Sequence, residues 1–169
     1  QSSSVCSSWC SRNYWEIIQL IIPMLNTKMV IRILGFLLVI EGLFMFLSIP
    51  ISLIYREGDY PVFILSGMIT IIVGGVMWLI SKNAPVNLYR REGYIIVTLV
   101  WVLFSLFGTL PFLLSGSIPS FTNAFFETMS GFTTTGATIL DDIESLSHGV
   151  LFWRSITHWI GGMGIIVLS

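Results

Sequence analysis

The chain has 169 residues, of which 54% are hydrophobic and only 10% are charged, and its mean hydropathy is +0.88. A soluble domain carries about 25% charged residues, so this composition excludes an ordinary water-soluble protein. The formal net charge of −1 gives no indication of a nucleic-acid partner. We therefore expect an integral membrane protein whose first partner is the lipid bilayer.

The first 23 residues differ in character from the rest of the chain. Met24 and the polar residues after it look like a natural start ahead of a first span, so we interpret residues 1–23 as a non-native or flexible leader. The alternative is a genuine amphipathic extension. Cys6 and Cys10 lie in this segment and are the only cysteines, and a C-x3-C pair without companions predicts neither a metal site nor a disulfide.

Three apolar segments follow in the first two thirds of the chain. Residues 33–55, 62–81 and 93–115 are 23, 20 and 23 residues long. As helices they measure about 30–34 Å, which is enough to cross a bilayer. The first two apolar segments are expected to form a helical hairpin. This hairpin belongs to a region of residues 24–92 that ends in a cytoplasmic loop, and the third apolar segment begins a second region of residues 93–169.

The basic residues predict the orientation of these spans. Two of them, Arg56 and Arg154, fall on one face of the membrane, and six fall on the other. The six are Arg12, Lys28, Arg32, Lys82, Arg90 and Arg91. Because Lys and Arg accumulate on the cytoplasmic side, we expect a cytoplasmic N-terminus and an external end to the third span.

The pattern changes after this external end. Residues 119–133 have helical spacing but measure only about 22 Å, too short to span the hydrocarbon. The run of threonines from Thr133 and then Gly136 make a poor helix. Three acidic residues that must be in water follow, namely Asp141, Asp142 and Glu144. Residues 149–169 are again apolar, so the chain is expected to enter from outside, turn partway and return before a last span.

This arrangement suggests a pore rather than a simple loop. Non-helical backbone at membrane depth is tolerated only where it is buried in protein or lines a water-filled cavity. A short half-helix followed by an extended threonine-glycine segment is a way to present carbonyl oxygens to a dehydrated cation, and the external acids would concentrate cations at its mouth. Threonine-glycine turns are common, so the alternative for this segment alone is an ordinary external turn.

Two stretches carry a family resemblance. "NAFFETMSGFTTTGATIL", residues 123–140, and "FWRSITHWIGGMGIIVL", residues 152–168, resemble the first pore repeat of the Trk/Ktr superfamily of potassium uptake proteins, and most of all its TrkH-type membrane subunits. The resemblance implies an all-α integral membrane fold in which a two-helix hairpin precedes one M1–pore-helix–M2 repeat of a K⁺-channel-like architecture. It also implies a bacterial inner-membrane location, a homodimer of the full-length chain and a cytosolic nucleotide-binding regulatory subunit of the TrkA or KtrA kind.

The resemblance also assigns the ion site. It implies a selectivity filter in which the first four carbonyls bind K⁺, most directly at the first two positions, with Thr133 on the cavity side. The filter residues are Thr134, Thr135, Gly136, Ala137 and Thr138. Glu127, one turn from the filter, either supports the filter backbone or attracts cations. A complete family member supplies four filter segments, so we expect this chain to be an N-terminal fragment of a transporter, with its M2 truncated.

Other polar and small residues within the spans have two readings each. Glu41 in the first span has either a packing or hydrogen-bonding role or a functional one. Arg154 and His158 are expected to anchor the last helix and contact its neighbours, the alternative being a proton relay through His158. Three glycines of the last span are expected at helix contacts, and a gating hinge is the alternative. They are Gly161, Gly162 and Gly164.

The sequence thus predicts potassium uptake without covalent chemistry, with K⁺ as the transported ion and no bound cofactor. The alternative is a non-conducting structural or assembly membrane protein, a remnant of a transporter. An intramembrane enzyme is disfavoured because the sequence lacks a G-x-S-x-G nucleophile motif.

Overall fold

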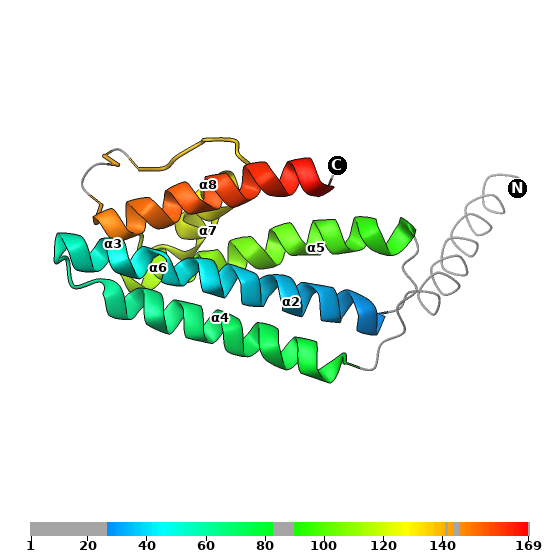
Figure 1. Cartoon of the computed structure of the whole chain (residues 1–169). Coiled ribbons are helices and arrows are strands. Elements are labelled where there is room, and N and C mark those ends of the chain that lie inside the picture. The colour runs from blue at the N-terminus through cyan, green and yellow to red at the C-terminus, as the bar shows by residue number, and fades with distance from the viewer. Residues whose placement is uncertain (1–26, 83–89, 141, 144–145, 169) are drawn as a thin grey trace, which may run out of the picture.

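The computed structural model describes residues 27–82, 90–140, 142–143 and 146–168, so the predicted leader, residues 1–23, lies outside the described residues. Every regular element in the described part is a helix, and the long helices lie side by side along one direction (Figure 1). In chain order they are α2 (Thr27–Phe46), α3 (Ser48–Tyr55), α4 (Tyr60–Ile80), α5 (Arg90–Gly108), α6 (Leu110–Leu114), α7 (Phe121–Phe132) and α8 (His148–Leu168).

Three helical stretches of the described chain are long and apolar enough to cross a membrane: Thr27–Tyr55, Tyr60–Ile80 and Gly93–Leu114. They coincide with the three predicted spans, except that the first begins at Thr27 rather than at residue 33. The final helix α8 has 21 residues, and the short helix α7 has 12 where the sequence predicted residues 119–133. The described residues thus have the helical architecture that the family resemblance implies, and three of the helical stretches have the length and apolar composition of membrane spans.

Prolines interrupt two of the spans. α2 ends at Phe46 and α3 begins at Ser48, because Pro50 lacks an N–H and its ring would clash with the Phe46 carbonyl four residues earlier. Pro111 acts in the same way between α5 and α6. Each break falls in the second half of its span.

The two hairpin helices, α2 and α4, approach each other closely through glycines. A Cβ built on Gly35 would lie 2.7 Å from the Gly74 carbonyl oxygen, and one built on Gly42 would lie 3.0 Å from that of Gly67. Because lipid offers no hydrophobic drive for helix association, such small residues allow the backbone contact that holds membrane helices together.

The short helix α7 is held between α5, α6 and α8. Its inner side chains Ala124 and Phe132 are fully buried. Trp153 of α8 is fully buried as well, and its Nε1–H donates to the Gly108 carbonyl at the end of α5 over 3.0 Å. α7 is thus fixed inside the bundle, and the segment that follows it starts from a rigid support.

Candidate functional site

The end of α7 sets the conformation of the threonine-glycine segment. The N–H of Thr134 donates to the Gly131 carbonyl over 3.0 Å, and the N–H of Thr135 donates to the Ser130 carbonyl over 3.1 Å. These two bonds form a Schellman motif, in which the residue after the C-cap adopts the left-handed conformation. Thr134 occupies that position with φ of +56°, where glycine is the usual residue. A β-branched residue there is strained, at a cost of about 1–3 kcal/mol.

The same two hydrogen bonds determine where the first carbonyls point. In a trans peptide the C=O lies opposite the N–H of the next residue. The carbonyls of Thr133 and Thr134 therefore point away from α7, because the following N–H groups point back to it. Gly136 has φ of +75°, so positive φ recurs two residues after Thr134. Residues Thr134 to Thr138 are exposed in this chain, so the outward-pointing Thr134 carbonyl lies on an exposed stretch of backbone.

The farther part of the segment is tied back to α7. Ser130 Oγ donates to the Ala137 carbonyl over 2.6 Å. One of the four predicted ligand carbonyls, that of Ala137, is thus engaged by the helix. Closer to α7, the hydroxyls of Thr133 and Thr135 lie 2.8 Å apart and hydrogen-bond each other. Hydrogen bonds therefore hold the segment to α7 at its start and at Ala137.

Glu127 is the side chain that joins the elements on either side of the segment. It is 2% exposed, and its Oε2 accepts a hydrogen bond from the Ile139 N–H over 3.1 Å. Its Oε1 accepts from Arg154 Nε on α8 over 2.7 Å. The carboxylate is buried and fully paired, so this geometry favours the supporting role for Glu127 over cation attraction, and a helix contact for Arg154.

Glycines bring α8 against the end of α7. A Cβ on Gly161 would collide with the carbonyl oxygen of Phe132, the last residue of α7, and would lie 2.9 Å from its Cα. A Cβ on Gly131 would collide with Thr157 Oγ1. In contrast, a Cβ on Gly162 would have only Thr134 Cγ2 within 4 Å, at a distance of 3.9 Å. Helix contact, rather than a hinge, is the role that this geometry gives Gly161.

Of the three acidic residues after the segment, only one is described. Asp142 is exposed, whereas Asp141 and Glu144 lie outside the described residues. Near the same end of the bundle, Glu57 in the α3–α4 loop accepts from His148 Nδ1 over 2.5 Å, and Tyr55 stacks on the imidazole with ring centroids 3.8 Å apart. Partial burial raises the pKa of Glu57, but the hydrogen bonds from His148 and Gly149 and the nearby His148 charge lower it by more, so the pKa lies below its ordinary value.

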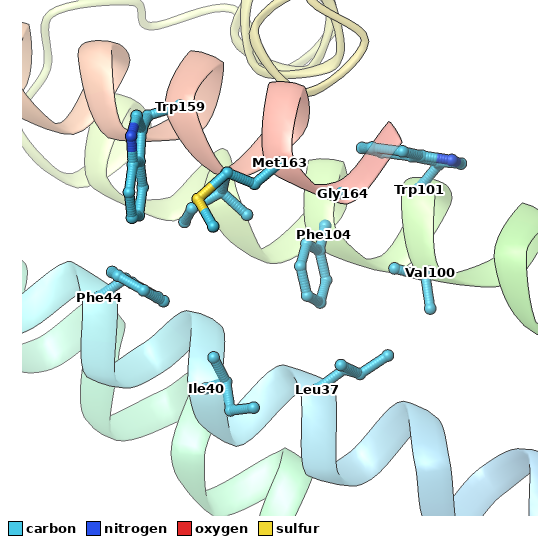
Figure 2. Close-up of a pocket in the computed structure, with 10 residues that line it drawn as sticks. Leu37, Ile40, Phe44, Val100, Trp101, Phe104, Trp159, Met163 and Gly164 are labelled. Carbon is cyan, nitrogen blue, oxygen red and sulfur yellow. The ribbon is translucent and has the colours of Figure 1, made fainter. Parts of the chain in front are cut away.

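A separate apolar pocket lies between α2, α5 and α8. Figure 2 shows Leu37 and Ile40 from α2 facing Phe104 from α5 and Met163 from α8. The pocket has a volume of about 440 Å³ and a lining that is almost entirely hydrocarbon. Without oxygen ligands it cannot replace the hydration shell of a cation, so it is not the ion site.

Sequence reasoning did not identify three of the residues that shape the site. Ser130, Ile139 and Glu57 act through hydrogen bonds whose partners are 7, 12 and 91 residues away in the sequence. Of these, only Ser130 carried a usable signal, because a serine in the last turn of a short helix is placed to bond the loop that follows.

Comparison with known proteins identifies the family. A family model named TrkH and described as a cation transport protein matches residues 59–169. The chain belongs to the TrkH family. The TrkH-family chain is 40% identical over 146 residues to the Trk system potassium uptake protein TrkH of Halomonas elongata, and 38% identical over 146 residues to that of Escherichia coli K12. Each match covers 86% of this chain and 30% of the relative, so the chain spans 30% of the length of these curated relatives.

A solved structure supports the same assignment. The crystal structure of the potassium transporter TrkH from Vibrio parahaemolyticus superposes with a TM-score of 0.80 at 36% sequence identity, covering 85% of this chain and 31% of that one. The TrkH resemblance, the helical membrane fold and the partial coverage expected from the sequence are therefore confirmed.

Proposed function

We propose that this chain contributes one segment of the selectivity filter of a potassium uptake protein, with Thr134, Thr135, Gly136, Ala137 and Thr138 as the filter residues. K⁺ would be the transported ion, bound most directly by the carbonyls of Thr134 and Thr135. The names of the TrkH relatives, which describe potassium uptake, support this proposal. Transport through such a filter needs no covalent chemistry and no bound cofactor.

One observation carries the proposal. The Schellman end of α7 turns the Thr133 and Thr134 carbonyls away from the helix, while Glu127 and Ser130 hold the far end of the segment at Ile139 and Ala137. A filter requires fixed oxygens, since carbonyls replace the hydration shell of the ion. The negative end of the α7 dipole also lies at this point and favours a cation.

A single segment cannot surround an ion. The other segments belong, in our proposal, to parts of the transporter beyond this chain, and the exposed surface of Thr134 to Thr138 is where they would gather. Exposed Asp142, together with Asp141 and Glu144, would raise the cation concentration at the external mouth, an attraction screened within about 8–10 Å at physiological salt.

The location and partners are also proposals. Lys28 at the start of α2 and Lys82 after α4 lie at one end of the bundle, and Arg56 lies at the other (Figure 1). This distribution supports a cytoplasmic N-terminus in the bacterial inner membrane. A homodimer of the full-length chain and a TrkA-type or KtrA-type nucleotide-binding regulatory subunit follow from the family resemblance.

Rubidium uptake by the full-length transporter tests the filter assignment. Gly136→Ser should reduce Rb⁺ uptake or its preference over Na⁺ while membrane insertion remains normal, because φ of +75° disfavours any side chain there. Gly58→Ser is a matched control: Gly58 has φ of +76°, and at both glycines a Cβ would meet nothing within 4 Å. Equal uptake and selectivity in the two variants would exclude Gly136 from the filter.

A further inference from the structure

Glu41 is a buried acid in the middle of the Thr27–Tyr55 span that the proposed transport pathway does not use. Its side chain is completely buried, and neither carboxyl oxygen has a hydrogen-bond partner among the described residues. Burying a polar group without a partner is costly in an apolar environment, and acids inside a membrane are rare unless they have a role. The surroundings of this carboxyl therefore call for a partner.

The Glu41 carboxyl lies close to the end of α5, beside the helix that carries the proposed filter segment. A Cβ built on Gly108 at the end of α5 would lie 3.1 Å from Glu41 Oε1 and 2.8 Å from Thr128 Cγ2 on α7. Phe132 Cε2 borders the same glycine at 3.0 Å. The missing side chain of Gly108 thus lets an acid of the hairpin approach the helix that carries the filter.

The neighbouring hydroxyls define what kind of partner fits. Thr109 and Thr128 are both fully buried, and their Oγ1 atoms lie 3.4 Å apart. Each also donates to a backbone carbonyl four residues earlier in the chain, Thr109 to Ser105 and Thr128 to Ala124. Because these protons are engaged, the hydroxyl oxygens can accept a hydrogen bond but have no further proton to give. The site is rich in acceptors and needs a donor.

We propose that Glu41, Thr109 and Thr128 form a buried polar site that binds a water molecule and one proton, linking the protonated carboxyl of Glu41 to the pore helix. The protonated acid can donate its proton to the water, and the water can donate its two protons to the hydroxyl oxygens of Thr109 and Thr128. Glu41 is then a positioning residue for the filter, acting through α7. This inference rests on the proposed filter function, since the filter is what α7 supports.

Selectivity of the full-length transporter tests the positioning role. In proteoliposomes, Glu41→Leu should lower the preference of uptake for Rb⁺ over Na⁺ by about fivefold or more. This factor corresponds to the free energy of one buried hydrogen bond. Glu41→Gln keeps the shape and supplies its own donors, so it should retain most of the preference. Ser48→Ala is the control, since Ser48 is another fully buried and unpartnered polar residue of the same span.

Two further measurements keep the inference testable if Glu41→Leu fails to fold. Thr128→Val, which removes only the hydroxyl, should lower the same preference. The infrared band of a protonated carboxylic acid should be present in the wild-type protein and in Ser48→Ala and reduced in Glu41→Gln. Unchanged selectivity in Thr128→Val, or an identical acid band in Glu41→Gln, would overturn the inference. Wild-type protein without any uptake would instead refute the proposed function, and the infrared comparison would still decide the protonation of Glu41.

Discussion

Glu127 of α7 and Arg154 of α8 form an ion pair behind the proposed filter segment, with 2.7 Å between Oε1 and Nε. The Glu127 side chain is almost completely buried, and its second oxygen holds the Ile139 backbone. One carboxylate therefore joins α7, α8 and the backbone that follows the proposed filter segment.

Removing this carboxylate should destabilise the protein. Glu127→Ala leaves Arg154 without its partner and frees the Ile139 N–H, so we expect the free energy of unfolding to fall by about 3 kcal/mol, at the lower end of the range for broken buried pairs. Chemical denaturation in detergent measures this value. Glu57→Ala, which breaks a pair that includes the half-exposed His148, should cost less than about 1 kcal/mol. Equal losses in both variants would contradict the role given to Glu127.

The contact between Gly161 and Phe132 makes a second prediction. Gly161→Ala places a Cβ against the Phe132 carbonyl, so α8 must move away from the end of α7, and we expect both lower thermal stability and altered ion selectivity. Gly162→Ala on the same helix is the control, because the new Cβ would lie 3.9 Å from its nearest neighbour beyond the helix. If these glycines formed a gating hinge instead, both variants should change channel opening and leave thermal stability unchanged.

The strained backbone of Thr134 leads to a third prediction. Thr134→Gly should relieve the strain at φ of +56° and raise thermal stability by an amount equivalent to about 1 kcal/mol. The same change removes the constraint on the carbonyl direction, so the preference for Rb⁺ over Na⁺ should fall although the protein is more stable. A variant that is less stable than wild type, or equally selective, would show that Thr134 does not store strain for the filter.

The lowered pKa of Glu57 predicts a pH dependence. A carboxyl whose pKa is lower in the folded protein stabilises the fold above its ordinary pKa of 4.5, and this contribution is lost as the pH falls through the lowered value. The difference in Tm between wild type and Glu57→Gln should therefore be present near neutral pH and disappear in acid. A difference that grew on acidification would reverse the sign and refute the pairing with His148.

The three spans and the end of the short helix α7 were predictable from the sequence for a simple reason. Long apolar runs can be satisfied only by crossing helices, and "TTTGAT" cannot continue a helix, so both signals are local. The helix break at Leu47 was visible in principle, since Pro50 follows it by three residues, yet the hydropathy of the run concealed it.

The supporting contacts were not predictable, because they join residues that are distant in the sequence. Glu127 could be recognised as a pore-helix acid, but its partners Ile139 and Arg154 depend on how α7 and α8 are packed. Thr134 in the left-handed conformation runs against intrinsic preference, and only the capping bonds of α7 impose it. Local propensity gives way at such positions to the requirements of the site.

The position of the ion itself tests the central proposal most directly. A structure of the full-length transporter in Rb⁺, with the ion located by anomalous scattering, should show Rb⁺ coordinated by the carbonyl oxygens of Thr134 and Thr135, together with oxygens from other segments of the transporter. Anomalous density elsewhere along the pathway, with none within coordination distance of these two carbonyls, would contradict the assignment of residues 134–138 as a filter segment.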